Sequence, residues 1–368
     1  MPMSHVATLE SYIAKNILSE AAFAQYKLGD VAHRELQPYV AELRRVSEAY
    51  VTHETGTRLH SPIHSARAAQ AYALYYTPIN AAKLLHLSPL LQFERSEISM
   101  LDVGCGPGTA ALAILSSLQQ RVRITCVESS PHMSELALSL IEAWDINNNL
   151  LGVRMRNSVE PRLETYDLVV AANVLAELSH EQSVATLSAL TQSVSRGGYL
   201  LLLEPGQQLH TRRLMEMRDR VVASRSDLAP IFPCTRSSEC PMLSASATDW
   251  CHDTLEWQQP PLNAQLDHLL SFNKHRIKYA AFIFQQGGSV PSGVRILTPP
   301  CKTRLGTEAL VCGDSFYGTA RLRKGLRSER TRPFEKGKVF DRLLVSGSLQ
   351  EEIAEDTAFA KVDRPRPI

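Results

Sequence analysis

The chain has 368 residues, more than the roughly 250 to 300 that a single hydrophobic core usually organises, so we expect at least two domains. No apolar run approaches the roughly 20 residues that span a bilayer, and the formal net charge of +1 hides an uneven distribution. Seven cysteines without a secretory leader favour a reducing compartment, where thiols are more often metal ligands or core residues than disulfides. We therefore expect a cytoplasmic protein without a membrane partner.

Residues 1–95 have the pattern of a helical N-terminal unit, because apolar residues recur at spacings of three and four. Within it, Thr77 and Pro78 predict the start of a new helix, with Thr77 as N-cap and Pro78 at the first helical position. Four other side chains could face RNA or a partner, but packing onto the next domain is the favoured interpretation. They are Arg67, Tyr72, Tyr75 and Tyr76.

Short apolar runs alternate with helical patterns over residues 96–225. The strand-like runs are SMLDVG, VRITCVE, YDLVVAAN and YLLLLEP. This alternation predicts an α/β fold, a doubly wound, Rossmann-like parallel sheet with helices on both faces. Ligands of open α/β sheets bind outside the carboxyl ends of the strands, so the residues that end each strand are the candidate site residues.

A glycine-rich loop follows the first of these runs, in the segment LDVGCGPGTA. Gly104, Gly106 and Gly108 suit a turn with positive φ that approaches a ligand closely, since glycine has no Cβ. The spacing differs from the dinucleotide fingerprint G-x-G-x-x-G, and Asp102 is not part of that fingerprint. The segment resembles motif I of the class I S-adenosylmethionine-dependent methyltransferases. That resemblance implies that Asp102 and the glycines hold the methionine part of the cofactor.

Two later strand ends supply further candidates. Glu128 ends the second strand about twenty residues after the loop, where an acid can accept hydrogen bonds from both ribose hydroxyls. Asn173 ends the strand YDLVVAAN, and Glu177 follows one helical turn later; both are weak catalytic candidates, and Asn173 could also contact the cofactor. For Cys105 and Cys126, core packing is favoured over a nucleophilic role.

The region 226–345 is predicted to be a cysteine-bearing extension, in which short runs such as KYAAFIFQ and EALVC suggest a small β-rich appendage. Four thiols in it can bind zinc or hold an iron–sulfur cluster. There is no C-x-x-C pair, and the wider spacing favours a cluster over zinc. The candidate ligands are Cys234, Cys240, Cys251 and Cys312, with Cys301 as the alternative fourth ligand and His252 beside the third.

Several motifs together resemble a known family. They are EPG before an R-x5-R helix, PC-x5-CPM, DWCH, KHR-x-KYA, RAAQAYALYYTPIN and YDLVVAANVLAEL. They are similar to the bacterial and mitochondrial small-ribosomal-subunit methyltransferase-like proteins, the Rsm-twenty-two family. Two segments depart from its pattern, Gln207–Gln208 after EPG and ARLRKGLRSER. The resemblance implies a role on the small ribosomal subunit, particularly in its assembly, an S-adenosylmethionine site, and in mitochondrial members a four-iron four-sulfur cluster on the four cysteines.

The C-terminal part is strongly basic. Between Gln265 and Val345 there are fifteen Lys and Arg against six Asp and Glu, which is the electrostatic footprint of a protein that binds a phosphate backbone. The first cations of this basic stripe are close to the cysteines in sequence, and Arg321–Lys338 extends it. Residues 346–368 are expected to be a disordered tail.

Two functions are consistent with these features. The first is an S-adenosylmethionine-dependent methyltransferase that acts on small-subunit ribosomal RNA, as a monomer and without DNA. The second is a non-catalytic, RNA-binding assembly factor that keeps the cofactor fold, since fold alone does not imply activity. The lack of an N-P-P-Y tetrad after the strand YDLVVAAN favours the second.

Overall fold

The computed structural model describes residues 2–52, 61–144, 146–158, 164–304, 306–313, 317–323, 339–340 and 362–363. The chain divides into two compact units. The first comprises Met1–Pro205 and Thr254–Tyr279, and the second comprises Gly206–Asp253 and Ala280–Ile368.

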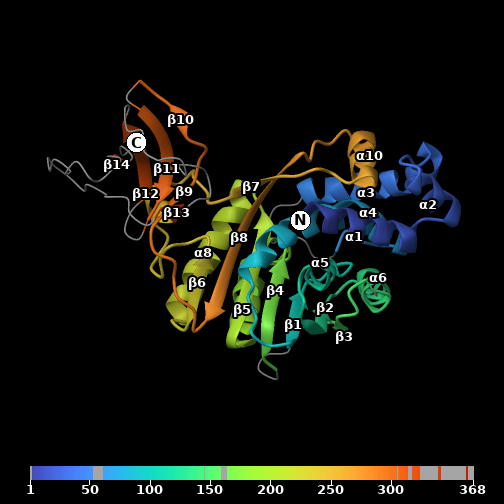
Figure 1. Cartoon of the computed structure of the whole chain (residues 1–368), viewed down its shortest axis with the longest axis horizontal. Coiled ribbons are helices and arrows are strands. Elements are labelled where there is room, and N and C mark those ends of the chain that lie inside the picture. Colours follow the sequence, from blue (N-terminus) through green and yellow to red (C-terminus); the bar gives the residue numbers. More distant parts are fainter. Residues whose placement is uncertain are drawn as a thin grey trace. The chain divides into compact units, whose positions relative to one another are not determined.

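A mostly parallel sheet forms the centre of the first unit (Figure 1). Within this unit the strands follow the order β3-β2-β1-β4-β5, and β1 pairs in parallel with both β2 and β4. They are β1 (Glu97–Val103), β2 (Arg121–Val127), β3 (Leu150–Arg156), β4 (Tyr166–Ala172) and β5 (Val194–Pro205). The unit also includes most of β7 (Asp253–Glu256) and the first four residues of β8 (Arg276–Gln286), with which β7 pairs. This order confirms the predicted α/β, doubly wound fold. From β1 the chain adds β2 and β3 on one side and β4 and β5 on the other, so the strand order reverses between β1 and β4. A ligand crevice is expected at the carboxyl ends of these two strands.

Two features of the sheet differ from the sequence-based expectation. Strand β3 was not predicted, because LLGVRMR is an edge strand whose half-exposed side chains lack a clear apolar run. The run KYAAFIFQ was expected as a short strand of the C-terminal appendage, but it is most of the longer strand β8, whose residues 276–279 belong to the first unit and 280–286 to the second. In β8, residues 277 and 279–284 are buried, as a strand inside a sheet requires.

Helices surround this sheet, and among the described residues none is long and apolar enough to cross a bilayer. They are α1 (Pro2–Ile17), α2 (Glu20–Lys27), α3 (His33–Thr52), α4 (Ala66–Leu87), α5 (Thr109–Ser117), α6 (Pro131–Glu142), α7 (His180–Gln192) and α10 (Pro261–Leu270). α4 packs against α1, α3 and α5, so the N-terminal helices are joined to the sheet through it.

Helix α4 runs without a break through Thr77 and Pro78, so the prediction of a new helix at Thr77 was wrong. The Thr77 hydroxyl pairs with the hydroxyl of Thr109 at 3.1 Å and does not cap a helix. A proline inside a helix costs about 3 kcal/mol, but sixteen residues of α4 are buried. Each large apolar side chain among them contributes about 1.5–3 kcal/mol, which outweighs the proline.

Helix α10 packs against α3 and α4, although about 210 and 170 residues of sequence separate it from them (Figure 1). Glu10 in α1 accepts hydrogen bonds from the backbone N–H groups of Leu262 and Asn263 at 3.1 and 2.6 Å. It thereby satisfies two of the free donors at the start of α10. The Tyr75 hydroxyl donates to Asp267 at 2.5 Å, which ties α10 to α4.

The second unit combines a helix with a small antiparallel sheet. That sheet has the order β13-β9-β11-β12-β14, with β10 beside β11, and β6 pairs antiparallel with the later part of β8. Its elements are α8 (Gln208–Ser224), β6 (Leu228–Phe232), α9 (Pro241–Ala245), β9 (Val294–Ile296), β10 (Cys301–Lys302), β11 (Gly306–Cys312), β12 (Tyr317–Arg323), β13 (Val339–Phe340) and β14 (Val362–Asp363). The predicted small β-rich extension is therefore present.

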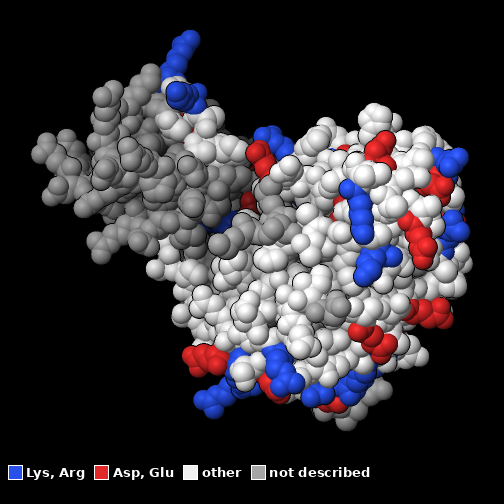
Figure 2. Space-filling view, turned by 45° about the vertical axis from the view of Figure 1, so that its right-hand side comes forward, with Lys and Arg blue, Asp and Glu red and all other residues white. Residues whose placement is uncertain are grey.

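Charged side chains of both signs are interspersed on the face shown in Figure 2. Near the start of the predicted basic stripe, Arg276 forms an exposed ion pair with Glu256 at 2.5 Å. The side chains of Arg321–Lys338 and most of the predicted tail, 346–368, lie outside the described residues. The stripe as a whole stays a prediction.

The buried carboxyl of Glu10 makes a testable contribution to stability. Burial raises its pKa from 4.5 to about 7, although the two backbone N–H groups and Tyr26 oppose the shift. The folded state therefore holds the proton more tightly, so this group's stabilisation is fully present below pH 4.5 and is lost as the pH rises through about 7.

We expect the stability of the wild type to fall relative to that of Glu10→Gln by up to about 3 kcal/mol between pH 4.5 and pH 8. Urea unfolding at several pH values measures this difference. Glu135→Gln, at an exposed position of α6, is the control and should show no such trend. A difference between wild type and Glu10→Gln that does not vary with pH would contradict the assignment.

Candidate functional site

The loop between β1 and α5 holds three glycines in the left-handed region, with φ of +67° at Gly104, +55° at Gly106 and +81° at Gly108. A Cβ on Gly104 would come 2.5 Å from Cβ of Val174, and one on Gly108 would come 2.9 Å from Cδ1 of Ile141. At Gly106 no atom lies within 4 Å of the Cβ position. Gly104 is thus required by close packing against Val174, whereas Gly108 faces the movable end of the Ile141 side chain and Gly106 borders open space.

Glu128, directly after β2, faces this loop. The Gly106 N–H donates to its Oε2 at 3.0 Å, and the Ser130 N–H donates to its Oε1 at 2.8 Å. These bonds fix the orientation of the carboxylate. Each carboxylate oxygen has lone pairs for a further bond, so Glu128 can also accept hydrogen bonds from two neighbouring hydroxyl groups.

Asp102, near the end of β1, is 1% exposed, and its Oδ2 has no hydrogen-bond partner. Burial raises its pKa to about 7, a hydrogen bond with the backbone of Ala111 lowers it, and the charge of Glu128 raises it further. A buried acceptor without a partner is costly in a native protein. An ammonium group in the adjoining pocket would supply the missing donor.

These residues line one pocket with a volume of about 400 Å³, within the range of small-ligand sites. The glycine loop, Asp102 and Glu128 form one side of the lining, and the segment after β4 contributes Asn173 and Glu177. The structure therefore brings to one pocket the residues that the sequence suggested for the cofactor, except Gly108, which is not part of the lining.

The N-terminal helices also contribute to the lining, which sequence reasoning missed. Tyr50 and Tyr72 line the pocket, and the rings of Tyr72 and Tyr76 pack in a tilted arrangement at a centroid distance of 4.8 Å. Tyr75 is fully buried, and Arg67 lies over the ring of Tyr39 at 5.3 Å. Arg67, Tyr75 and Tyr76 are not part of the pocket lining and pack within the first unit.

A buried acid controls the loop after β4, and sequence reasoning missed it too. Glu204, near the end of β5, accepts hydrogen bonds from the backbone N–H groups of Leu175 and Ala176 at 2.8 and 3.3 Å. Burial raises its pKa to about 8. The loop begins at Asn173, which has a φ of +57°. The rule that strand ends carry the site residues, applied to YLLLLEP, would have found Glu204.

Three further buried side chains lie inside the first unit; burial was predicted from the sequence for the two cysteines but not for Lys83. Lys83 on α4 is 4% exposed, and its Nζ donates to Asn80 Oδ1 at 2.8 Å. Burial lowers the pKa of Lys83 to about 8. Cys105 and Cys126 are both buried, and the pKa of Cys105 is raised by its hydrogen bond with Cys126 and by burial, which suits the expected core role.

The second unit holds a separate pocket, which is lined by Cys234, Cys240, Cys251 and Cys312. Cys301 lies exposed on β10 and is not part of the lining, so the structure places Cys312 with the other three thiols. Across the described residues, no group of three or more His, Cys, Asp or Glu side chains is arranged to hold a metal ion. The metal site stays a prediction.

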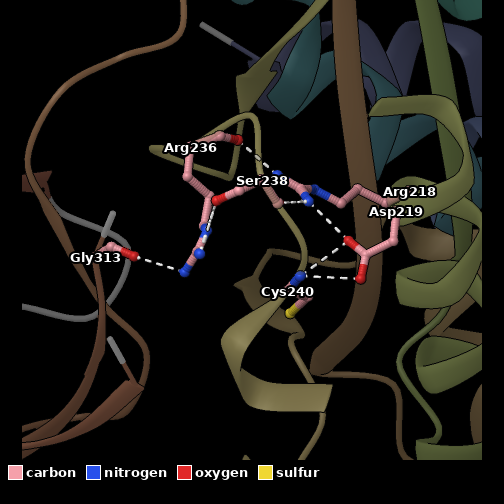
Figure 3. Close-up of polar contacts among 6 residues, drawn as sticks. All are labelled: Arg218, Asp219, Arg236, Ser238, Cys240 and Gly313. Carbon is pink, nitrogen blue, oxygen red and sulfur yellow. Dashed lines mark hydrogen bonds and ion pairs between the residues drawn. The ribbon is translucent and has the colours of Figure 1, made fainter. Parts of the chain in front are cut away.

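Polar contacts from α8 hold the chain between the first two cysteines (Figure 3). Both carboxylate oxygens of Asp219 accept from the Cys240 N–H, at 3.1 and 2.9 Å. The Arg218 guanidinium donates to the backbone carbonyls of Ser238 and Arg236 and to Asp219. A loop with little regular structure is thereby fixed through its backbone.

The other two cysteines are held by similar contacts. Arg236 donates to the carbonyl of Gly313 at 3.1 Å, directly after Cys312 (Figure 3). The Cys251 N–H donates to Sδ of Met215 on α8 at 3.3 Å. Three chain segments far apart in sequence are thus brought to one pocket by contacts of the protein itself.

Burial is the largest influence on the pKa values of the four thiols, and it raises each of them. It raises the pKa of Cys234, although Arg218 and Arg295 lower it, and it raises the pKa of Cys251 to about 12. The pKa of Cys312 is raised by burial and then by the other three thiols, which line the same pocket. A cation in the pocket would favour the thiolate forms.

Comparison with solved structures gives partial likenesses. Coclaurine N-methyltransferase, solved with N-methylheliamine and SAH, is 13% identical, with 76% of this chain and 94% of that chain covered and a TM-score of 0.35. A SAM-dependent methyltransferase from Thiobacillus denitrificans, solved with S-adenosyl-L-homocysteine, is 14% identical, with 55% and 90% covered and a TM-score of 0.33.

Sequence comparison is more specific. The Rsm22-cox11 tandem proteins 1 and 2, mitochondrial, of Schizosaccharomyces pombe are each 24% identical over an alignment of 272 residues, and 62% of this chain is covered. The match covers only 35% of the length of these curated relatives. A family model described as mitochondrial small ribosomal subunit Rsm22 matches residues 66–316, more than half of the chain. The chain therefore belongs to the Rsm22 family.

Proposed function

We propose that this protein binds S-adenosylmethionine in the pocket of the first unit and acts as a methyltransferase on the RNA of the small ribosomal subunit. The arrangement around Gly106 carries the cofactor part of the proposal. There, an open backbone position, the unpartnered Oδ2 of Asp102 and the fixed carboxylate of Glu128 face one pocket.

The donors and acceptors of the pocket fit the cofactor's parts. Asp102 would accept from the ammonium of the methionine part, Glu128 would accept from the ribose hydroxyls, and Gly106 would allow close approach. The bound cofactor supplies an electrophilic methyl group. Asn173 and Glu177 line the same pocket and would orient the methyl acceptor, so catalysis rests chiefly on positioning.

The proposed partner follows from the family and from charge. The family description names the mitochondrial small ribosomal subunit, and the basic stripe favours a phosphate backbone. Structured RNA would be recognised by shape and backbone contacts. The cytoplasmic location, the monomeric state and the absence of a DNA partner stay predictions.

The second unit is proposed to hold an iron–sulfur cluster on Cys234, Cys240, Cys251 and Cys312, with zinc as the alternative. The donor set supports this, since four thiols line one pocket together with the buried side chains of Arg218 and Arg295. Four thiolates with a metal centre form an anionic group, which buried guanidinium groups can balance.

A non-catalytic assembly factor is the second candidate function. The observation that favours it is the chemistry at the end of β4, where Asn173 carries an amide that is not a strong base. In this case the pocket would still bind the cofactor, and the cofactor-bound protein would serve as a scaffold on the subunit.

The cofactor proposal predicts a specific effect of Gly104→Ala. The added Cβ would meet Val174, and overpacking of this kind costs about 1–3 kcal/mol. We expect affinity for S-adenosylmethionine to fall on the order of tenfold or more, measured by calorimetry. The control is Gly197→Ala, which has a φ of +77° and no neighbour within 4 Å of the Cβ position. It shares the backbone strain but should bind normally.

Methyl transfer decides between the two functions. Immature small subunits are incubated with wild type and labelled cofactor, and the RNA is searched for labelled nucleotides. If the protein is a methyltransferase, the wild type should label the RNA and Gly104→Arg should abolish the labelling. If the wild type labels nothing and Gly104→Arg still associates with the subunits, the scaffold function is the correct one.

The metal proposal is tested by a matched pair of cysteine variants. After anaerobic purification the wild type should contain iron and acid-labile sulfide, whereas Cys251→Ser should lose both. Cys301→Ser should retain them, because Cys301 lies outside the pocket. If the purified wild type is colourless and contains stoichiometric zinc, the iron–sulfur proposal is wrong and the zinc alternative is correct.

A further inference from the structure

Two buried arginines beside the four thiols are not explained by the folding of the second unit alone. Arg218 on α8 is fully buried, and Arg295 on β9 is 6% exposed. Arginine is among the residues that are least often buried, because removing its charge from water is costly. Both arginines line the pocket of the four cysteines.

The terminal nitrogens of both side chains have protein partners. Arg218 donates to Asp219 at 2.7 Å and to two backbone carbonyls. Arg295 donates to Asp253 at 2.7 Å and lies over the ring of Phe232 at 5.0 Å. These contacts fix both guanidinium planes, so neither group is free to turn toward water.

The Nε–H groups, by contrast, have no well-aligned hydrogen-bond partner in either arginine, although the Arg218 side chain interacts with the thiol of Cys234. An unmet buried donor costs about 1–3 kcal/mol, and here two occur on residues that line one pocket. In addition, Arg295 is the direct cross-strand partner of Cys312 in the β9–β11 pairing. The fold therefore places one of these donors beside a predicted metal ligand.

We propose that Arg218 and Arg295 are positioning residues for an anionic four-thiolate metal group. Their Nε–H groups donate hydrogen bonds to the sulfur atoms of this group. The inference rests on the proposed metal site but goes beyond it, because it assigns a role to residues that are not ligands. Hydrogen bonds to sulfur and nearby positive charge stabilise the more negative state of such a group. For a cluster, this state is reached when one electron enters from an external low-potential donor, with no proton taken up and no bond broken.

The test compares variants of the full chain whose clusters have been reconstituted under anaerobic conditions. Arg295→Met removes the charge and the donor, and Arg295→Lys keeps the charge but removes the Nε donor. Dithionite and redox mediators set the potential, and electron paramagnetic resonance measures the reduced fraction. We expect the ratio of reduced to oxidised cluster to fall about tenfold in Arg295→Met, since a hydrogen bond to a charged group contributes about 1.5–3 kcal/mol. Arg295→Lys should fall between this variant and the wild type.

The matched control is Arg220→Met, an exposed arginine on α8, which should leave the ratio unchanged. Arg218→Met is measured in parallel, with circular dichroism as the check on folding. If it does not fold, the conclusion rests on Arg295. A wild-type ratio in a folded Arg295→Met protein would overturn the inference and leave the metal site intact.

The metal content of the wild type separates the other outcomes. If the wild type holds zinc, release of zinc to a chromophoric chelator is measured instead, and it should be about tenfold faster from Arg295→Met. Equal release rates would overturn the inference. If the wild type binds neither iron nor zinc, the proposed metal site itself fails, and the inference fails with it.

Discussion

The packing of Gly104 against Val174 joins the two loops on which the cofactor pocket depends. Gly104 follows β1 and Val174 follows β4, the neighbouring strands between which the sheet order reverses. With no room for a Cβ, the two loops approach at the carboxyl ends of their strands. Glu204, on the neighbouring strand β5, holds the second loop by accepting hydrogen bonds from the backbone N–H groups of Leu175 and Ala176. The pocket is thus shaped by backbone contacts, and its side chains are left for the ligand.

Sequence patterns predicted the strands and site residues that depend on residues close together in the chain. Continuous apolar runs identified β1, β2, β4 and β5, since strands buried on both faces need them. The spacing of Asp102, Gly104, Gly106 and Glu128 placed them at adjacent strand ends, and the structure brings them to one pocket. The edge strand β3 carries no such run, and the proline of α4 suggested a helix start that burial overrides.

Long-range features were out of reach of sequence patterns. The choice between Cys312 and Cys301 depends on where each residue lies in a small sheet: Cys312 ends β11 opposite Arg295, whereas Cys301 pairs with Glu308, four residues earlier on β11. Spacing in the sequence does not report this. Buried charges such as Lys83 and Arg218 look like ordinary surface residues in a sequence. Their burial depends on partners in other segments, as the contacts of Arg218 with the carbonyls of Ser238 and Arg236 show.

The contact between Glu10 and the start of α10 has a consequence for the order in which the chain folds. The two partners are about 250 residues apart, and a chain emerges from the ribosome at about 5–20 residues per second. Helix α1 must therefore wait on the order of ten seconds or more for the segment that satisfies its buried carboxylate. During this interval the N-terminal helices lack one of their packing surfaces, so they complete their fold only late in synthesis.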